Sequence, residues 1–310
     1  MNTQRPMDND RLLLVHHAAN RDHDYPPNSL AGLRHCLEAG ALVVEVDINP
    51  LRGGDFALLH DDVLEGQTDG SGPVAAATAG QVRSLRYKRQ GTLTGEPVGL
   101  LSQALALIQG YPHFRELQLD LKISPALTDA ALEYLLRMLE PVKALVRVTS
   151  GADWTLRRLR ALDADLALGF DPLLYLEVGD PGEEVPPFRQ GAYGYWDDHP
   201  LAARRWGPTA EYLAAHAEAL WVQAPAHAVW YIHALLLERA LDDGFDWIAY
   251  LHGRSTPVDA WTLDVGKAGH PALARRLAAA GVDRITTNDA PRLAAVLGDV
   301  DEDHPVAVDF

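Results

Sequence analysis

Short apolar runs alternate with amphipathic helical patterns along most of the chain, and this alternation restricts the fold more than any other feature. Such repeats are typical of a parallel sheet whose strands are connected by helices. About eight units are present, which predicts a (β/α)8 TIM barrel in the α/β class. The strand candidates are residues 12–15, 43–48, 56–59, 117–123, 145–150, 167–170, 220–223, 258–263 and 282–287. These are slightly more than eight, so we expect one of the two runs beside Gly53-Gly54, or 220–223, to lie outside the ring.

Helical patterns fall between most of these runs, at residues 30–39, 78–87, 101–109, 128–139, 154–162, 227–241 and 272–280. Residues 11–297 are therefore expected to form a single barrel domain. Residues 61–100 are rich in Gly, Thr and Ala and contain too few apolar side chains for a separate core. We expect them to form a small insertion after the third strand. Residues 298–310 are an acidic tail whose ends we expect to fray.

The run 43–48 carries two acids, Glu45 and Asp47, two positions apart. Both carboxylates leave the same face of a strand, and burying unpaired charge is costly. A hard divalent cation is the natural partner for carboxylate oxygens. The run 56–59 ends at His60, and a hairpin centred on Gly53-Gly54 would place His60 opposite Asp47. Imidazole titrates near neutral pH, so His60 next to the acids is a candidate general acid or base. The alternative is that His60 has only a structural role, as a lone histidine at the end of an apolar strand more often has.

The run 117–123 alternates strictly, so Gln118, Asp120 and Lys122 share one face. Glu45, Asp47 and Asp120 then form a candidate three-carboxylate metal site, and oxygen ligands favour one Mg²⁺ or Ca²⁺ ion over Zn²⁺. The alternative is three unrelated acids on half-exposed strands. Lys122 forms either a plain ion pair with Asp120 or, facing inward, a phosphate contact.

Composition restricts the partners. The 310 residues carry a formal charge of −16, which disfavours nucleic acid and anionic membranes. A single cysteine, Cys36, excludes an internal disulfide. No apolar stretch reaches about 18 residues, so no integral membrane segment is expected. With no signal peptide pattern at the start, we expect a cytoplasmic protein. The oligomeric state stays open.

The E-x-D pair, the Gly turn, the His60-Asp61 end and the stretch Thr68–Val74 together resemble the glycerophosphodiester phosphodiesterase family. The ending resembles it too, with Trp261-Thr262 and then Gly281-Val282-Asp283 before Pro291. The matching motifs run from His16 to Pro291. The resemblance implies a phosphatidylinositol-phosphodiesterase-like TIM barrel that hydrolyses glycerophosphodiesters to glycerol 3-phosphate and an alcohol.

The resemblance also implies roles for individual residues. Two histidines flank the scissile phosphate in the family, and His16 and His60 correspond to them. Lys122 matches a phosphate-binding lysine, Asp120 replaces the usual metal-binding glutamate, and Trp261 matches a residue that borders the substrate. The family motif H-R-G falls on His16-His17-Ala18, so His17 stands in the place of a phosphate-binding arginine.

Alternatives remain open for the alignment of the H-R-G motif and for the function of the protein. The register could shift by one residue, which makes His17 the proton-transfer histidine and Ala18 the substitute for arginine. The function could instead be a phosphodiesterase or phospholipase acting on a lipid headgroup, or a non-catalytic barrel that binds phosphodiesters. In each case the expected partner is a small-molecule phosphodiester.

Overall fold

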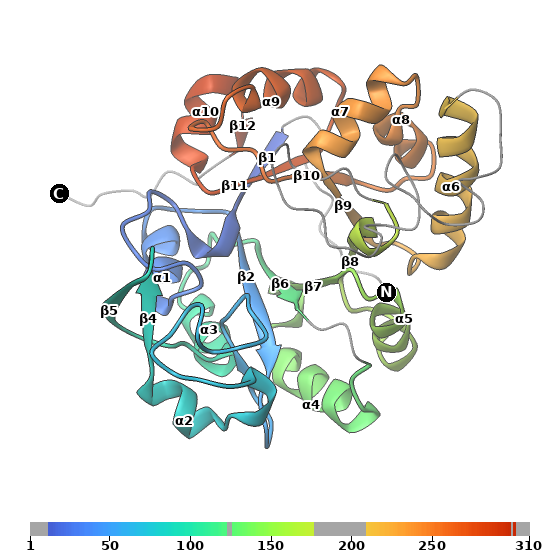
Figure 1. Ribbon diagram of the computed structural model, residues 1–310. Helices are drawn as coiled ribbons and strands as arrows, with labels where there is room; N and C mark the ends of the chain where they lie inside the picture. Colours follow the sequence, from blue (N-terminus) through green and yellow to red (C-terminus); the bar gives the residue numbers. More distant parts are fainter. Residues whose placement is uncertain (1–11, 123–125, 177–208, 299, 302–310) are drawn as a thin grey trace.

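The computed structural model describes residues 12–122, 126–176, 209–298 and 300–301. Eight parallel strands close into a ring, because β1 hydrogen-bonds to β11 on one side and to β2 on the other (Figure 1). The predicted TIM barrel is confirmed. In order around the ring the strands are β1 (Leu12–His16), β2 (Val43–Pro50), β6 (Glu116–Leu121), β7 (Val146–Ser150), β8 (Leu168–Phe170), β9 (Val229–His233), β10 (Val258–Trp261) and β11 (Arg284–Thr287).

Helices surround the ring of strands (Figure 1). They are α1 (Leu30–Glu38), α3 (Leu101–Ile108), α4 (Asp129–Leu139), α5 (Asp153–Leu162), α6 (Thr209–Gln223), α7 (Ala234–Asp242), α8 (Trp247–His252), α9 (His270–Ala279) and α10 (Ala290–Leu297). Short 3-10 turns are η1 (His17–Ala19), η2 (Val74–Ala76), η3 (Glu140–Leu145) and η4 (Pro172–Leu174). None of the described helices combines the length and the apolar character that crossing a bilayer would require.

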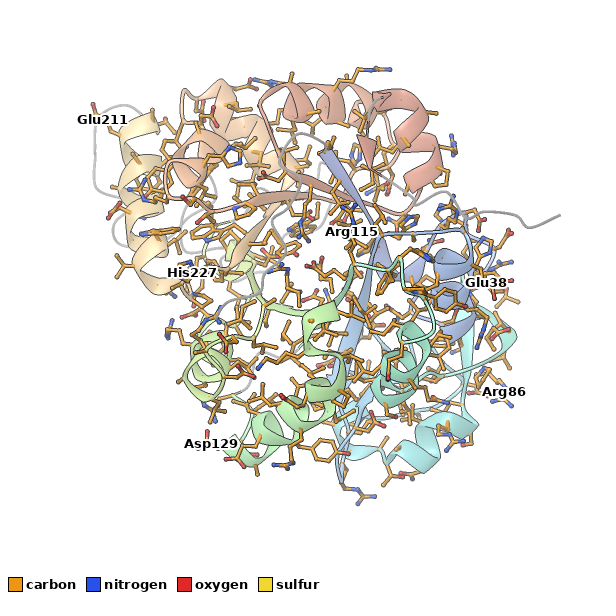
Figure 2. All side chains as sticks on the ribbon, turned by 180° about the vertical axis from the view of Figure 1, so that it is seen from behind. Glu38, Arg86, Arg115, Asp129, Glu211 and His227 are labelled. Atoms are coloured by element: carbon orange, nitrogen blue, oxygen red, sulfur yellow. The ribbon has the colours of Figure 1, made fainter. Side chains whose placement is uncertain are left out.

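Strand β2 shows how the sequence divides the barrel into two layers. Its alternate residues Val44, Val46 and Ile48 belong to the large apolar core that packs between the strands and the helices. Glu45 and Asp47 take the intervening positions and face the inside of the ring, as strand alternation requires. Side chains fill both layers (Figure 2). The interior therefore presents polar groups where the outer layer is apolar.

The barrel interior below the acids is held by a buried ion cluster. Arg147 donates to both carboxylate oxygens of Glu116, at 3.0 and 2.8 Å, and Arg284 donates to the same group at 2.6 Å. Burial raises the pKa of Glu116, but the two guanidinium groups outweigh it and hold the pKa well below its usual range. Asp259 lies alongside and accepts a hydrogen bond from the Thr286 hydroxyl at 2.8 Å. Burial raises the pKa of Asp259 to about 7.

The segment between β2 and α3 contains β3 (Phe56–Ala57), α2 (Ala79–Ser84), β4 (Arg86–Arg89) and β5 (Thr92–Pro97), beside α1 and α3 (Figure 1). Its apolar side chains, from Leu51 to Leu100, form a second buried cluster that is separate from the large core of the barrel. Thr78 caps α2 in a capping box with Gln81. The expectation that residues 61–100 contain too few apolar side chains for a separate core is therefore wrong, because this segment forms a small buried cluster together with Leu51, Ala57 and Leu59 just before it.

Two strand predictions are corrected. Of the run 56–59, only Phe56–Ala57 forms a strand, β3, which pairs antiparallel with the end of β2 and lies outside the ring. The insertion therefore follows the second barrel strand and not, as predicted, the third. Asn49 faces Ala57 and Pro50 faces Phe56, a register one residue from the one predicted, and the pairing stops there. The left-handed conformations of Gly53, Gly54 and Asp55 widen the turn beyond a simple two-residue hairpin.

Residues 220–223 form the end of helix α6 rather than a strand, and 229–233 form strand β9 inside what was predicted as one helix. Both errors have the same cause: short buried apolar runs carry no periodicity that separates helix from strand. In the tail, Gly298 and Val300–Asp301 are described, and the latter form β12, which pairs with β1 at Leu12 and Leu13. The rest of the predicted tail, and Ile123 of the run 117–123, lie outside the described residues.

Candidate active site

Three carboxylates converge at the carboxyl end of the barrel strands, where TIM-barrel enzymes bind their substrates. One oxygen from each of Glu45, Asp47 and Asp120 lies within 4.8 Å of the other two. The register of β2 and β6 explains this proximity, because Asp47 lies directly beside Asp120 and Glu45 beside Gln118. Parallel neighbours in register present their side chains on the same face, so two sequence-distant motifs build one cluster.

Neighbouring polar groups hold the acids in place. The Asn28 amide donates to Asp47 Oδ2 at 2.7 Å and accepts from the Asp47 backbone at 2.9 Å. The backbone N–H of Ala18 donates to Glu45 Oε2 at 2.6 Å. Glu45 Oε1 is buried and accepts no hydrogen bond from any described residue. A buried, unsatisfied carboxylate oxygen within a cluster of acids is what a bound cation would satisfy.

Lys122 neutralises part of this charge. Its Nζ lies 2.6 Å from Asp120 Oδ2 and 3.2 Å from Asp47 Oδ1. Burial lowers the pKa of Lys122, but the surrounding carboxylates outweigh it and raise the pKa well above its usual value. Burial also raises the pKa of Glu45, and the charges of Asp47 and Asp120 add to this rise. Burial raises the pKa of Asp47 too, yet the positive charges of Lys122, His60 and His17 hold it below its usual value.

His17 lies on the barrel side of the site. Its Nε2 is 3.8 Å from Glu45 Oε2, and its Nδ1 is 2.9 Å from Asn288 Oδ1. The Asn288 amide nitrogen faces Asp264, at 3.2 and 3.1 Å from the two carboxylate oxygens, which can only accept. Asn288 therefore turns its oxygen to His17, and His17 Nδ1 carries the proton. In the neutral form of His17, the Nε2 that faces the acids is therefore the acceptor, and in the charged form it donates.

His16 faces the other side of the sheet. Along β1, Leu14 belongs to the outer core, whereas Val15 packs with Val43 inside the ring. By this alternation His16 follows the outer face, and its side chain is fully buried. The structure therefore places His17, and not His16, beside the acids. Ala18 and Ala19 both adopt left-handed conformations that turn the chain away from the strand.

His60 reaches the site from the start of the insertion, without the strand pairing to Asp47 that the hairpin register predicted. Its ring is 54% exposed, and its Nδ1 lies 3.0 Å from Asp61 Oδ1. The Gln67 side-chain oxygen accepts from the backbone N–H groups of His60 at 2.8 Å and Asp61 at 2.9 Å. His60 lies close enough to Asp47 for its positive charge to lower that acid's pKa.

Trp261 ends β10 and stacks on His233, which ends β9, with ring centroids 4.9 Å apart. The pair lies at the same end of the barrel as the acids, but the described contacts of Trp261 do not reach them. Three supporting residues were not predicted as site residues, namely Asn28, Asp264 and Asn288. A polar side chain directly after a buried strand was the available signal for Asn288, and its distance in sequence from His17 hid the contact.

The fold and the site define a TIM barrel with an acidic, histidine-flanked cluster at its carboxyl mouth, an arrangement suited to metal-assisted chemistry on an anionic substrate. Residues 16–291 match the model of the glycerophosphoryl diester phosphodiesterase family. The chain belongs to this family, and the predicted resemblance is confirmed.

Curated relatives match part of the chain, and solved structures share its fold. Rat glycerophosphodiester phosphodiesterase 1 is 40% identical over 76 residues, which are 24% of this chain and 23% of the rat protein. The alignment thus spans about a quarter of that relative. A glycerophosphoryl diester phosphodiesterase from Parabacteroides distasonis is 17% identical with a TM-score of 0.62, covering 94% of this chain and 87% of the other. A phosphodiesterase from Oleispira antarctica, solved with the product sn-glycerol-3-phosphate, is 18% identical with a TM-score of 0.64, covering 93% and 97%. At these identities the structures support the fold.

Proposed function

We propose that this protein hydrolyses glycerophosphodiesters to glycerol 3-phosphate and an alcohol, with the help of one divalent cation. The observation that carries the proposal is the cluster of Glu45, Asp47 and Asp120, flanked by two histidines in a barrel of this family. The three acids would hold the ion, and their hard oxygen donors suit Mg²⁺ or Ca²⁺. When bound, such an ion neutralises phosphate charge and helps to position the nucleophile.

The residues of the chain supply the remaining steps. Lys122, already beside Asp47 and Asp120, would turn one or more of its donors to a phosphate oxygen. In its neutral form, His17 would accept at Nε2 a proton from the attacking water, whose oxygen bonds to phosphorus as the bond to the alcohol oxygen breaks. Asn288 and Asp264 act as positioning residues, since they fix the tautomer and the orientation of the imidazole.

His60 would protonate the oxygen of the departing alcohol. Its ring is open to solvent, and Asp61 orients it through the 3.0 Å contact with Nδ1, which leaves Nε2 to face the substrate. Two histidines on different elements, one poised to accept and one to donate, are what cleavage of a phosphodiester with a poor leaving group requires. Trp261, stacked on His233, would border the substrate.

The proposal is tested by incubating the protein with sn-glycero-3-phosphoethanolamine and measuring release of sn-glycerol 3-phosphate with and without a chelator. We expect turnover with Mg²⁺ or Ca²⁺ and none in excess chelator. Full activity in chelator would exclude the metal-assisted mechanism. No turnover of any glycerophosphodiester with any of these ions would leave the protein as a phosphodiester-binding barrel.

A lipid substrate is the second candidate. Leu173 and Leu174 follow β8 at the mouth of the barrel and are 38% and 40% exposed, which gives the rim an apolar element. An apolar rim favours a substrate with an acyl chain. The test compares cleavage of lysophospholipid micelles with cleavage of glycerophosphodiesters. If the micelles are cleaved faster, and the double variant Leu173→Ser with Leu174→Ser removes that difference, a phosphodiesterase acting on lipids replaces the first proposed function.

A further inference from the structure

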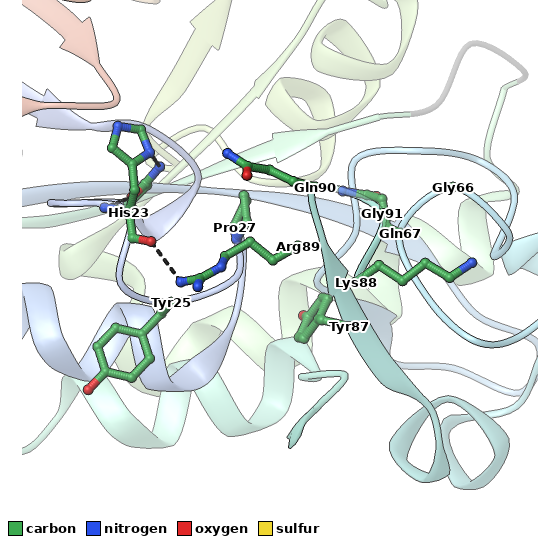
Figure 3. A pocket seen from close by; sticks show the side chains of 11 residues that line it. His23, Tyr25, Pro27, Gly66, Gln67, Tyr87, Lys88, Arg89, Gln90 and Gly91 are labelled. Carbon is green, nitrogen blue, oxygen red and sulfur yellow. Dashed lines mark hydrogen bonds between the residues drawn. The ribbon is translucent and has the colours of Figure 1, made fainter. Parts of the chain in front are cut away.

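A cavity of about 480 Å³ lies between the loop after β1 and the insertion (Figure 3). Its walls come from residues 20–27 on one side and from residues 66–67 and 87–91 on the other. Its volume falls within the range of small-molecule sites. The proposed mechanism assigns no substrate group to this cavity.

The cavity adjoins the reacting groups through two of its walls. The side-chain oxygen of Gln67, a residue that lines the cavity, accepts hydrogen bonds from the backbone N–H groups of His60 and Asp61. Tyr87, which also lines it, donates to the backbone carbonyl of Asn28 at 3.0 Å, and Asn28 in turn holds Asp47. The cavity therefore begins beside the histidine that would protonate the departing alcohol.

Two cations line the cavity from strand β4. Arg89 donates through Nη1 to the backbone carbonyls of His23 at 2.9 Å and Asp24 at 2.7 Å, and its other donors have no described protein partner (Figure 3). Lys88 donates to the backbone carbonyl of Glu65 at 2.9 Å, which leaves two of its three donors for a ligand. Carbonyl partners do not cancel these charges. Gln90 and Gly91 both have positive φ, so a tight two-residue turn fixes the hairpin that carries Arg89.

The neutral groups of the cavity add further donors. His23 takes a hydrogen bond at Nδ1 from the Asn20 side-chain nitrogen at 3.0 Å, while the Asn20 oxygen accepts from the His23 backbone. The proton of the imidazole is therefore on Nε2, where it is available to a ligand. Gln67 uses its oxygen within the protein, which leaves its amide nitrogen as a donor.

None of the described residues that line the cavity is acidic, in a chain whose formal charge is −16. Acidic residues do lie near its walls in the sequence, at Asp22, Asp24, Asp61 and Glu65. A backbone hydrogen bond from Gly72, and to a smaller extent the charge of Lys88, lower the pKa of Glu65, and Asp61 Oδ2 lies beside Gly66. Glu65 accepts from the backbone N–H of Gly72 at 2.7 Å, and Asp22 lies 2.7 Å from His35 Nε2. Among the lining side chains themselves, a cationic headgroup would meet two positive charges and no carboxylate, whereas an anionic headgroup would meet several hydrogen-bond donors.

We propose that this cavity binds the leaving alcohol of the substrate and selects alcohols that carry a negative charge over ammonium headgroups. Lys88 and Arg89 are the specificity-determining residues, and His23 and Gln67 supply neutral hydrogen bonds. The inference rests on the proposed function, because it names the class of substrate for the same active site. The glycerol phosphate portion would lie over the acids, and the alcohol would extend past His60 into the cavity.

A matched pair of substrates tests this. sn-Glycero-3-phosphoserine differs from sn-glycero-3-phosphoethanolamine by one carboxylate, so the ratio of their kcat/KM values isolates recognition of that charge. We expect phosphoserine to be preferred by about tenfold, the effect of two partly screened charges. Lys88→Gln and Arg89→Gln should each lower the ratio, and the double variant should bring it close to one. Arg83→Gln, which removes an exposed cation on α2 outside the cavity, is the matched control and should keep the ratio. Raising ionic strength should also lower the ratio.

The outcomes separate the two proposals. Turnover of both substrates with a ratio near one, unchanged in the Lys88 and Arg89 variants, would overturn the inference and leave the proposed function intact. A preference for the ethanolamine or choline diester would overturn it as well. Absence of turnover on every diester would overturn both. Arg89 also holds the loop through its hydrogen bonds to His23 and Asp24, so its removal changes both a charge and a structural contact. Arg89→Lys keeps the charge, and it should retain most of the kcat/KM ratio if the charge determines the preference.

Discussion

The imidazole Nδ1 of His17 lies 2.9 Å from the side-chain oxygen of Asn288, a residue 271 positions away in the chain. This contact joins the turn after the first barrel strand to the turn after the last one. It also determines which imidazole nitrogen faces the acids, because Asp264 holds the opposite end of the Asn288 amide. The closure of the barrel therefore sets the protonation pattern of a residue in the site.

Asn288→Ala should lower kcat by about tenfold with little change in KM, because His17 would then sample both tautomers and more than one orientation. The double variant Asn288→Asp with Asp264→Asn keeps an acceptor for Nδ1–H and avoids two facing carboxylates, so it should recover part of the loss. The check is a pH–rate profile of the three proteins with a fixed metal concentration. Equal loss in both variants, with an unchanged profile, would assign Asn288 a purely structural role.

The two adjacent histidines should behave differently. His17→Ala should lower kcat by about 10²–10⁴-fold at unchanged stability, since the half-buried ring packs little. His16→Ala removes a fully buried ring, so it should lower the melting temperature while the remaining folded protein keeps most of its kcat. Kinetics and thermal melts of both variants decide the register. The reverse pattern would return the role to His16.

His60→Ala should lower kcat by about 10²-fold or more on an unactivated diester, yet much less on a diester with a good leaving group, such as a nitrophenyl ester. A good leaving group departs without protonation, so the difference isolates the proton-donor role. The comparison uses steady-state kinetics on the two substrates. An equal loss on both would point to a role in binding or in positioning the nucleophile.

A divalent cation should raise the melting temperature, since an ion that binds only the folded state stabilises it by about 2.7 kcal/mol at a hundred times its Kd. Glu45→Gln and Asp47→Asn should each reduce this shift strongly. Glu96→Gln, on exposed strand β5, is the control and should keep it. Differential scanning fluorimetry with Mg²⁺, Ca²⁺ and chelator gives the measurement, and equal shifts in all four proteins would contradict the ion site.

Asp259 predicts a pH dependence of stability. Its folded-state pKa is raised to about 7, so the folded state binds a proton that the unfolded state releases at lower pH. The stability that this proton supplies is present below the unfolded pKa and is lost as pH rises toward 7. Asp259→Asn, which mimics the protonated acid, should therefore stabilise the protein at pH 8 by on the order of 2 kcal/mol and much less at pH 4. Denaturant unfolding at the two pH values is the check.

The sequence predicted the barrel and the three acids because strand alternation and i, i+2 spacing are local and survive in any parallel sheet. It could not predict that Val229–His233 is a strand, because a short buried apolar run has no periodicity that separates a strand from a helix. It could not decide between His16 and His17 either, because that choice depends on which face of β1 meets the interior. The contacts of Asn28 and Asn288 arise only after the barrel closes, and the cavity of Lys88 and Arg89 needs the insertion folded against the loop.

The acids that would hold the ion come from strands β2 and β6 of the ring, whereas the cations of the neighbouring cavity come from strand β4 of the insertion. The two sets of side chains thus belong to separately encoded stretches that meet through Gln67 and Tyr87. Substitutions or length changes in the hairpin can alter which alcohol is accepted without disturbing the residues that perform cleavage. The hairpin is in this sense an exchangeable part of the insertion, whereas His60 and the barrel strands keep the chemistry.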